Sequence, residues 1–291
     1  MKRLVLALTL LLAGCDNSDG PRVRDVTIWL QDPLAHLQTP LGDDVDKDCF
    51  QGTCTLNFTQ PSASGNVLRV QLGGAKPFRL NGVFSLTAVG YEEDRYRIAE
   101  ITLMPASPPT NSLHSEARTA FYQLLAQLGV AGWQRFIMQD SARLPGAEFN
   151  HTARIEQALP QASLNLPFND PAVPLNLAQW RSLPLISQWY FYRDDEYLSI
   201  IVQRENSDSA PNERGTYLFM LTFKTEAQQY QSYFTADDRP RWKSLLPALL
   251  KQMAQTRTEN EARMRDIGVT IDEHYRDPTI GALDKPATQA K

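Results

Sequence analysis

The sequence predicts an α+β fold in which antiparallel β-hairpins pack against a few amphipathic helices. The β-rich runs occur in adjacent pairs, at residues 83–91 and 96–104 and again at residues 189–192 and 197–203. A short charged connection joins the two runs of each pair, as is typical of a hairpin. Stretches with apolar residues at helical spacing follow the pairs. A parallel α/β sheet is disfavoured, because its strands would alternate with helices.

The chain before the first hairpin is predicted to form short strands separated by turns. Residues 26–30, 55–58 and 67–72 are rich in residues with high β propensity. Residues 32–48 show no clear periodicity and are predicted to form a loop.

The first helix is predicted from Ser112 to Leu128. It follows the break at Pro108-Pro109, Ser112 can cap its start, and Gly129 suits its C-terminal cap. Six apolar residues recur at helical spacing: Ala117, Ala120, Phe121, Leu124, Leu125 and Leu128.

The second half repeats the order of strands and then a helix. A strand is predicted at residues 216–223, and a helix begins near Asp238, with Pro247 expected to kink or divide it. Its apolar stripe contains Trp242, Leu245, Leu246, Leu249, Leu250 and Met253. Residues 254–266 are strongly polar, with Glu261 and Arg265 at i,i+4 spacing, and are predicted to be a solvated helical extension.

The two hairpins have charged tips of equal length, each flanked by tyrosines, at residues 91–96 and 192–197. This likeness supports the hypothesis of two related subdomains that arose by duplication, with chance likeness as the alternative. The predicted organisation lists a signal (1–14), a tether (15–24), a first subdomain (25–158), a proline-rich linker (159–184), a second subdomain (185–274) and a disordered tail (275–291).

The amino terminus has the features of an export signal. Lys2 and Arg3 precede an apolar run at residues 4–12, which is too short to span a bilayer as a helix. The run ends in Leu12-Ala13-Gly14-Cys15, which resembles the lipobox of bacterial lipoproteins.

The resemblance implies cleavage before Cys15 and attachment of acyl chains such as palmitate to this residue, which would anchor the chain stably in a lipid bilayer. The following Asp16-Asn17 resembles the signal that retains enterobacterial lipoproteins in the inner membrane. We therefore expect a periplasm-facing, lipid-anchored protein in a Gram-negative-type envelope, with the inner membrane favoured.

The charge of the exported chain disfavours nucleic acid as a partner. Residues 1–14 contain two basic and no acidic residues, so their removal changes the formal net charge from −4 to −6. Nucleic-acid binding requires a concentrated basic surface, so a mildly acidic exported chain is not expected to bind nucleic acid.

Two cysteines follow Cys15, at positions 49 and 54. In an oxidising compartment, this pair is predicted to form a disulfide that closes a small loop around Gly52. A redox or metal-binding pair is the alternative, although the spacing is not Cys-x-x-Cys.

Asp44, Asp46 and Asp48 alternate as do the first ligands of an EF-hand loop. The likeness then ends, because Cys49 replaces the required glycine and Thr55 replaces the bidentate glutamate. A non-standard Ca²⁺ site is one interpretation, and a solvated acidic loop is the other. No other cofactor is indicated.

No catalytic motif is present in the sequence. Four histidines are scattered at positions 36, 114, 151 and 274, and there is no Gly-x-Ser-x-Gly or Ser-x-x-Lys motif. We therefore expect the protein not to be an enzyme. A catalytic triad requires only spatial proximity, so an envelope hydrolase stays an alternative.

The function expected from these features is binding of a protein partner. The candidate contact residues are the two hairpin tips, Glu92, Glu93, Asp94 and Arg95, and Arg193, Asp194, Asp195 and Glu196. Acidic tips suit a basic partner, although charged tips also serve solubility.

The plan of lipobox, short tether and non-catalytic α+β domain resembles periplasmic lipoprotein immunity proteins of type VI secretion, which neutralise exported toxins. The resemblance concerns architecture and assigns no site residues. A structural accessory of an envelope or secretion assembly is the alternative.

Overall fold

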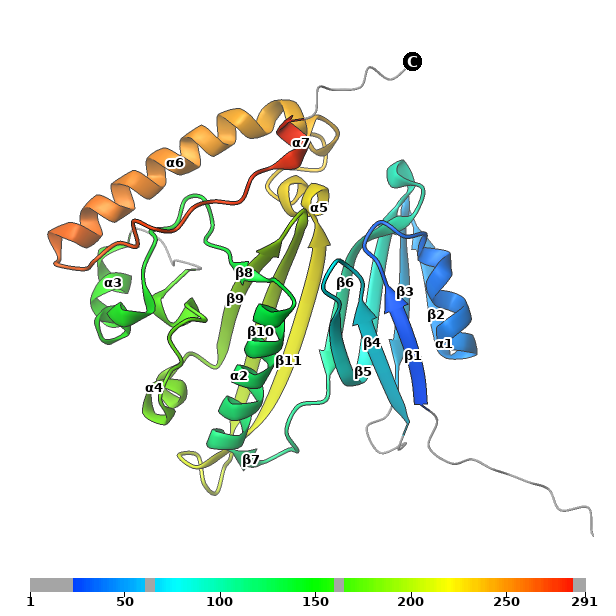
Figure 1. Cartoon of the computed structure of the whole chain (residues 1–291), viewed down its shortest axis with the longest axis horizontal. Helices are drawn as coiled ribbons and strands as arrows, with labels where there is room; N and C mark the ends of the chain where they lie inside the picture. Colours follow the sequence, from blue (N-terminus) through cyan, green and yellow to red (C-terminus); the bar gives the residue numbers. More distant parts are fainter. Residues whose placement is uncertain (1–22, 61–65, 160–164, 285–291) are drawn as a thin grey trace, which may run out of the picture.

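The computed structural model describes residues 23–60, 66–159 and 165–284. Over these residues the chain forms seven α-helices and one eleven-stranded, mostly antiparallel sheet, which confirms the predicted α+β fold (Figure 1). The predicted signal peptide, Cys15 and Asp16 lie outside the described residues.

The sheet runs in the order β1-β4-β5-β6-β11-β10-β9-β8, with β2 and β3 beside β5 and β7 beside β11. Both predicted hairpins are present, as β5–β6 and β9–β10. The strands are β1 (Val23–Ile28), β2 (Val45–Phe50), β3 (Thr53–Thr59), β4 (Val67–Leu72), β5 (Phe78–Tyr91), β6 (Arg97–Pro105), β7 (Ser112–Leu113), β8 (Gln134–Arg135), β9 (Ile186–Arg193), β10 (Glu196–Asn206) and β11 (Arg214–Thr225).

Among the described residues, α2 and α6 are the long helices, and the other helices have seven residues or fewer. They are α1 (Gln38–Leu41), α2 (His114–Val130), α3 (Thr152–Ala158), α4 (Leu177–Ser182), α5 (Glu226–Gln231), α6 (Trp242–Asp266) and α7 (Gly281–Asp284). A 3-10 turn, η1 (Leu34–Leu37), leads into α1. The predicted loop at residues 32–48 therefore contains helical turns and most of strand β2.

On one edge, strand β5 pairs with β4 along its first part and with β3 along its second part, while β6 pairs with its other edge. Near the end of the first part, Gly82 has a φ of +67°, and the register with β6 shifts between Val83 and Ser85. A glycine and a bulge at this place let a strand change direction. The segment after β1 then bonds the start of β6, with Gln31 N donating to Ile98 O (2.8 Å).

The two halves of the chain share this sheet. Strands β6 and β11 are hydrogen-bonded neighbours, and their paired residues Leu103 and Leu221 are both completely buried. Within the predicted linker, Leu166, Phe168 and Trp180 are buried, so the described part of this segment belongs to the core.

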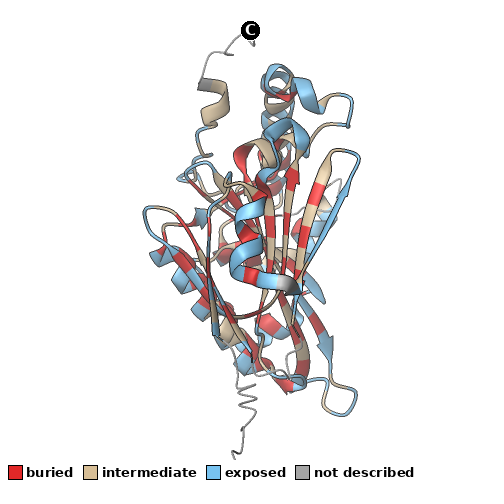
Figure 2. Ribbon diagram, turned by 90° about the vertical axis from the view of Figure 1, so that its right-hand side faces the viewer, coloured by how far each residue is buried: buried red, intermediate tan, exposed pale blue. Residues whose placement is uncertain are grey.

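Side chains cover both faces of strands β9 and β10. On one face, Phe121 of α2 packs against Trp180 and Trp189, with ring centroids 5.3 and 4.4 Å apart. On the other face, Tyr197 and Tyr230 belong to a second aromatic cluster near α5 and α6. The alternating burial along the strands is visible in Figure 2.

The C-terminal region differs from the predictions in its tail and along helix α6. Residues 275–284, expected to belong to a disordered tail, pack against the domain: Tyr275 Oη accepts a hydrogen bond from Ile137 N (2.9 Å), and Asp277 pairs with Arg257 (2.6 Å). The polar end of α6 is not simply solvated either, because Glu261 and Met264 are buried. Helix α6 is continuous through Pro247.

Candidate functional site

The two charged hairpin tips lie at the same end of the sheet. Strand β11 relates them, because Lys224 pairs with Glu100 of β6 and Thr225 pairs with Glu196 of β10. The centres of the two hairpins are three strand spacings apart, or about 14 Å. Helix α5 begins at this end, directly after β11.

The first tip consists of a 3-10 turn, η4 (Glu92–Asp94), and the two residues after it. All five residues from Glu92 to Tyr96 are exposed. Arg95 and Tyr96 have φ values of +56° and +53°, a conformation that is uncommon for residues other than glycine. Such conformations cluster at functional sites, because the surrounding structure must stabilise them.

The second tip is divided between surface and interior. Asp194 and Asp195 are exposed, whereas Arg193 is only 7% exposed. The Arg193 guanidinium donates to the carbonyls of Gly73 (2.9 Å) and Lys76 (2.9 Å) and forms an ion pair with Glu196. Arg193 and Glu196, predicted to contact a partner, are therefore engaged within the fold.

Burial raises the pKa of the Glu196 carboxyl above its ordinary range, and this effect exceeds the opposing effect of the Arg193 ion pair. The Arg193 guanidinium also lies 4.8 Å from the centroid of the Trp133 ring. In the second tip, Asp194 and Asp195 are thus the fully exposed residues, and Glu196 is partly exposed.

A hollow of about 400 Å³ lies beside the first tip, and we call it the tip groove. Buried side chains form its apolar floor, namely Leu34, Cys54 and Leu56. Lys47, Arg95 and Tyr96 are exposed and form a polar rim. Pro33, Ala35, Gln38 and Cys49 complete the lining.

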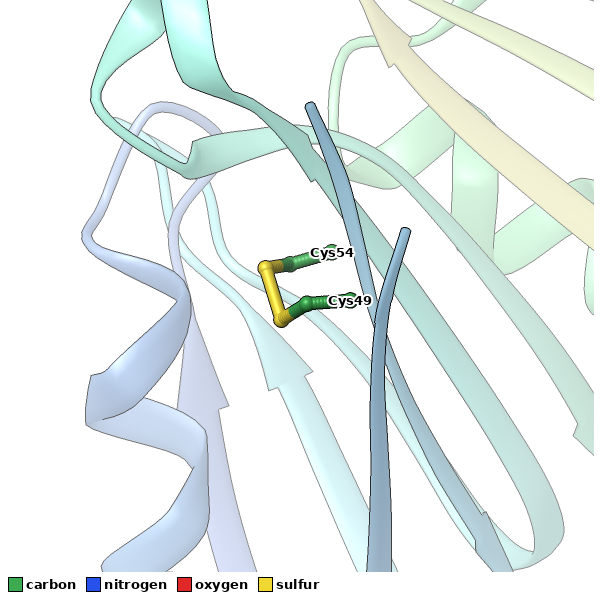
Figure 3. Close-up of a disulfide and its surroundings, with 2 residues drawn as sticks. All are labelled: Cys49 and Cys54. Carbon is green, nitrogen blue, oxygen red and sulfur yellow. A yellow bond between two sulfur atoms is a disulfide. The ribbon is translucent and has the colours of Figure 1, made fainter. Parts of the chain in front are cut away.

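The disulfide between Cys49 and Cys54 forms part of the groove wall, and its prediction is confirmed (Figure 3). The two cysteines are directly opposite each other in the β2–β3 hairpin, with an S–S distance of 2.05 Å. The bridge fixes the end of this hairpin next to the groove.

The three aspartates considered as calcium ligands, Asp44, Asp46 and Asp48, have different surroundings. Asp44 accepts a hydrogen bond from Arg24 (2.6 Å), whereas Asp46 and Asp48 are exposed on β2, opposite Asn57 and Thr55. Within residues 23–60, 66–159 and 165–284, no group of three or more His, Cys, Asp or Glu side chains could hold a metal ion. The calcium hypothesis therefore gains no support.

The β2–β3 hairpin contacts the first tip through its turn. Glu92 N donates to Gly52 O (2.8 Å), which places the turn of the β2–β3 hairpin against this tip. Phe50, at the end of β2, is 71% exposed beside this turn. The exposed ring of Phe50 is thus at the same end of the sheet as Glu92, Glu93 and Asp94, whereas Asp46 and Asp48 lie farther back along β2.

Two histidines are held by contacts within the domain. His114 is buried, with its Nδ1 atom 2.6 Å from Tyr217 Oη. The Nδ1 atom of His151 lies 2.5 Å from Glu148, which also accepts a hydrogen bond from the Thr270 hydroxyl. Burial alone would raise the pKa of Glu148, but the bonds from Thr270 and His151 lower it below its usual value.

Family models, curated proteins and solved structures were compared with the chain, and none matches. The proposals for its function therefore depend on its own geometry. In the described part of the chain, no helix combines the length and apolar character required to cross a bilayer.

The sequence identified the first tip and the disulfide but not the groove between them. The wall of the groove that sequence analysis did not identify is formed by η1 and α1, which lie in the segment predicted to be a loop. Leu34, Leu37 and Leu41 are buried there at helical spacing, and this short stripe is the signal that could have identified the wall.

Proposed function

We propose that the chain is a membrane-anchored periplasmic lipoprotein that binds a protein partner through the tip groove and the acidic residues around it. The observation that carries this proposal is an apolar floor within a rim that contains Lys47, Arg95 and the exposed aromatic ring of Tyr96. Binding energy in protein interfaces concentrates in such aromatic and apolar anchors, while the charged rim contributes to specificity and to the rate of association.

The position of the groove suits a lipid anchor at Cys15. Val23 follows Cys15 by eight residues and pairs with Val67, at the end of the sheet where β6 terminates in Pro105. The first tip lies at the other end of β6, whose nine residues span about 30 Å. In this arrangement the groove faces away from the membrane and is accessible to proteins of the periplasm.

The charges favour a partner with a basic surface. Three exposed carboxylates, from Glu92, Glu93 and Asp94, directly precede Arg95 in the first tip. Asp46 and Asp48 are also exposed, on the face of β2 opposite to Lys47. We infer that a basic partner is attracted by these carboxylates and inserts one apolar side chain into the groove. An exported toxin neutralised by this chain is the partner that the overall architecture favours, and a component of an envelope or secretion assembly is the alternative.

The partner is tested by affinity capture from detergent-solubilised envelopes with the full chain, followed by binding measurements with each purified candidate. Substitution of Glu92, Glu93 and Asp94 by lysine is expected to weaken binding at least ~10-fold, as is Ala35→Trp, which fills the groove. Asp208→Lys, an exposed charge change at the far end of the β10–β11 hairpin, is the matched control. Equal affinities for the tip variants and the control would exclude this end of the sheet as the binding surface.

The two candidate partner classes give different results. A toxic exported protein whose activity is suppressed by the chain supports the immunity function. A stoichiometric complex with assembly components supports the accessory function. Hydrolysis of wall or lipid substrates by the purified chain would instead favour the enzyme alternative.

The lipid anchor has its own test, which is metabolic labelling with radioactive palmitate. The full chain is expected to incorporate label and to sediment with membranes, whereas the Cys15→Ala variant is expected to do neither. Label incorporated in the variant would contradict acylation at this cysteine.

A further inference from the structure

Five neighbouring strands, β2, β3, β5, β6 and β11, present one sheet face that points away from the core. On the last four of them, core-facing residues such as Leu86 and Leu103 are buried, whereas the residues between them are partly or fully exposed. The register places the exposed residues in two rows across all five strands. The middle row is Asp46, Asn57, Thr87, Thr102 and Thr222, and the row nearer the hairpin tips is Asp48, Thr55, Val89, Glu100 and Lys224.

The polar side chains at the centre of the middle row are paired within the chain. The Thr87 hydroxyl donates to Asn57 Oδ1 (2.9 Å), and the hydroxyls of Thr102 and Thr222 are hydrogen-bonded to each other (3.0 Å). Groups paired in this way keep a partner when water is removed, so the penalty for an unsatisfied polar group does not arise. Another surface can therefore cover this row at low cost.

Apolar side chains flank the two rows. Met104 of β6 and Met220 of β11 lie on the same face, on the side of the middle row nearer Pro105, and both are partly exposed. Phe50 lies beyond the other row, at the end of β2, and is 71% exposed. Methionine adapts its shape to an opposing surface, and aromatic rings are enriched in interfaces. The face thus offers apolar surface that an opposing protein surface can bury.

The charges of this face are distributed unequally between its two edges. Asp46 and Asp48 are exposed at the β2 edge. Lys224 lies at the β11 edge, where its amine is 3.5 Å from the carboxylate of Glu100. The residues of both rows between these edges are otherwise uncharged. A surface that is acidic at one edge and has an ammonium group at the other is complementary to a reversed copy of itself.

We propose that this face binds a second copy of the chain, with a two-fold axis parallel to β5. In such an isologous interface, each strand faces the strand at the same distance on the other side of the axis. Strand β2 then faces β11 of the second copy, β3 faces β6, and Thr87 lies opposite the same residue. Asp48 of each copy approaches Lys224 of the other, so the two edges attract each other.

The alternative two-fold axis, perpendicular to the strands in the plane of the interface, is disfavoured by the same charges. It would place β2 opposite β2 of the second copy, so that Asp46 and Asp48 face the same aspartates. Like charges across an interface oppose association. The distribution of charge therefore selects the axis that is parallel to the strands.

The selected axis also keeps both tethered ends on one side. Rotation about the strand direction does not reverse that direction, so Val23 of both copies lies at one end and both tip grooves lie at the other. This agreement rests on the proposed anchor at Cys15, whereas the charge argument does not. The face is about 19 Å wide, and with a similar length its area is about 400 Å², half of what each partner buries in a standard interface. Association is therefore expected to be weak in solution and stronger where anchors confine both copies to one membrane.

The test is oxidative crosslinking of the Thr87→Cys variant of the full chain in isolated membranes, with a copper–phenanthroline oxidant and non-reducing electrophoresis. Thr87 lies at the axis, so the introduced thiols of two copies are expected to form a disulfide and give a band of twice the mass. Thr27→Cys, on the exposed side of β1, is the matched control and should give no such band. The wild type controls for the native cysteines, of which Cys49 and Cys54 are already bridged.

Two further substitutions in the Thr87→Cys variant test the charges and the contact. Asp48→Lys, on the exposed edge strand, places like charges opposite each other and is expected to lower the crosslinked fraction at least ~10-fold. Thr102→Arg introduces a charge at the centre and should do the same while thermal unfolding stays cooperative. Crosslinking that persists in both variants would overturn the proposal, as would equal bands from Thr87→Cys and Thr27→Cys or no band from Thr87→Cys.

The purified full chain in detergent gives the same readout without a membrane or another protein. A crosslinked fraction that rises with protein concentration is expected there. Failure of the proposed anchor or of the proposed partner would leave this result unchanged. Failure of the self-association would remove it and leave palmitate labelling and partner capture intact.

Discussion

At the scale of single residues, Arg193 connects three segments that are distant in the sequence. Its guanidinium contacts the carbonyls of Gly73, Lys76 and Ala131 and the carboxylate of Glu196. The fit is tight, because a Cβ atom added at Gly74 would lie 2.9 Å from the guanidinium. Arginine suits this place because its planar group can serve several acceptors at once.

Replacement of Arg193 is therefore expected to destabilise the fold strongly. Arg193→Met leaves buried carbonyls and the Glu196 carboxylate without a partner, and should lower the free energy of unfolding by about 3–5 kcal/mol in urea denaturation. Arg193→Lys should also destabilise, because an amine cannot reproduce the fork. Asp194→Asn, next to it but exposed, should change stability by less than about 0.5 kcal/mol. Equal effects of Arg193→Met and Asp194→Asn would contradict this role.

Glu261 supplies a prediction about pH. Burial alone would raise the pKa of its carboxyl, but two hydrogen bonds from Arg143, at 2.6 and 2.8 Å, lower it below the usual value. The ionised form is therefore favoured in the folded chain. The resulting stability is present above the unfolded-state pKa of ~4.3 and is lost as the pH falls through the lower folded-state value.

Glu261→Gln is expected to be about 2 kcal/mol less stable than the wild type at pH 7, because Arg143 loses its charged partner. The difference should shrink when the same urea denaturation is carried out near pH 3. A difference that is constant over this range would show that the ionised carboxylate is not the stabilising form.

At the scale of elements, the disulfide acts on one hairpin. It bridges opposite residues of β2 and β3, separated by five positions in the sequence, so it closes a small loop. The double variant Cys49→Ala/Cys54→Ala is expected to lose about 2 kcal/mol of stability. Hydrogen exchange should accelerate in β2 and leave the β9–β10 hairpin unchanged, and reductant should affect only the wild type. Equal acceleration in both hairpins would indicate a global role instead.

Sequence analysis identified the elements whose apolar residues recur with a strand or a helix period. Strands β4, β9, β10 and β11 have alternating or continuous apolar residues, and α2 has a complete apolar stripe. Strand β2 was missed because five of its six residues are exposed and give no alternation. Serine is a good cap, so Ser112 is predicted at the start of α2. In the structure Ser112 belongs to β7 and pairs with Gly215 of β11, and the helix begins at His114. Tertiary pairing decided that boundary.

At the scale of the whole molecule, the shared sheet predicts a single unfolding unit. The β6–β11 pairing places Leu103 and Leu221 in one core, so neither half buries its central strand without the other. Calorimetry of the full chain is expected to show one cooperative transition. A fragment of residues 23–159, expressed alone, is expected to show no cooperative transition in the same measurement. A cooperative transition in that fragment would support independent subdomains instead.

The candidate site could be predicted only in part, because it depends on contacts between residues that are far apart in the sequence. Charged connections between strands identify hairpin tips, and cysteine spacing identifies the disulfide. The burial of Arg193 depends on a contact with Gly73 across 120 positions. The approach of the β2–β3 turn to the first tip likewise depends on the register of β3 with β5. A single sequence contains no local signal for such long-range pairings.

The position of β1 has a mechanical consequence. Val23, the described residue nearest the proposed anchor, begins a strand that pairs with β4 over six consecutive positions, and Val26 and Ile28 of that strand are buried. A pull between the membrane and a partner bound at the hairpin end would act along these strands. The hydrogen bonds of the pair would then be loaded together in shear, and would not open one after another as in peeling. With the proposed anchor at Cys15, the load would enter the domain through an element that resists extraction while a bound partner is pulled away from the membrane.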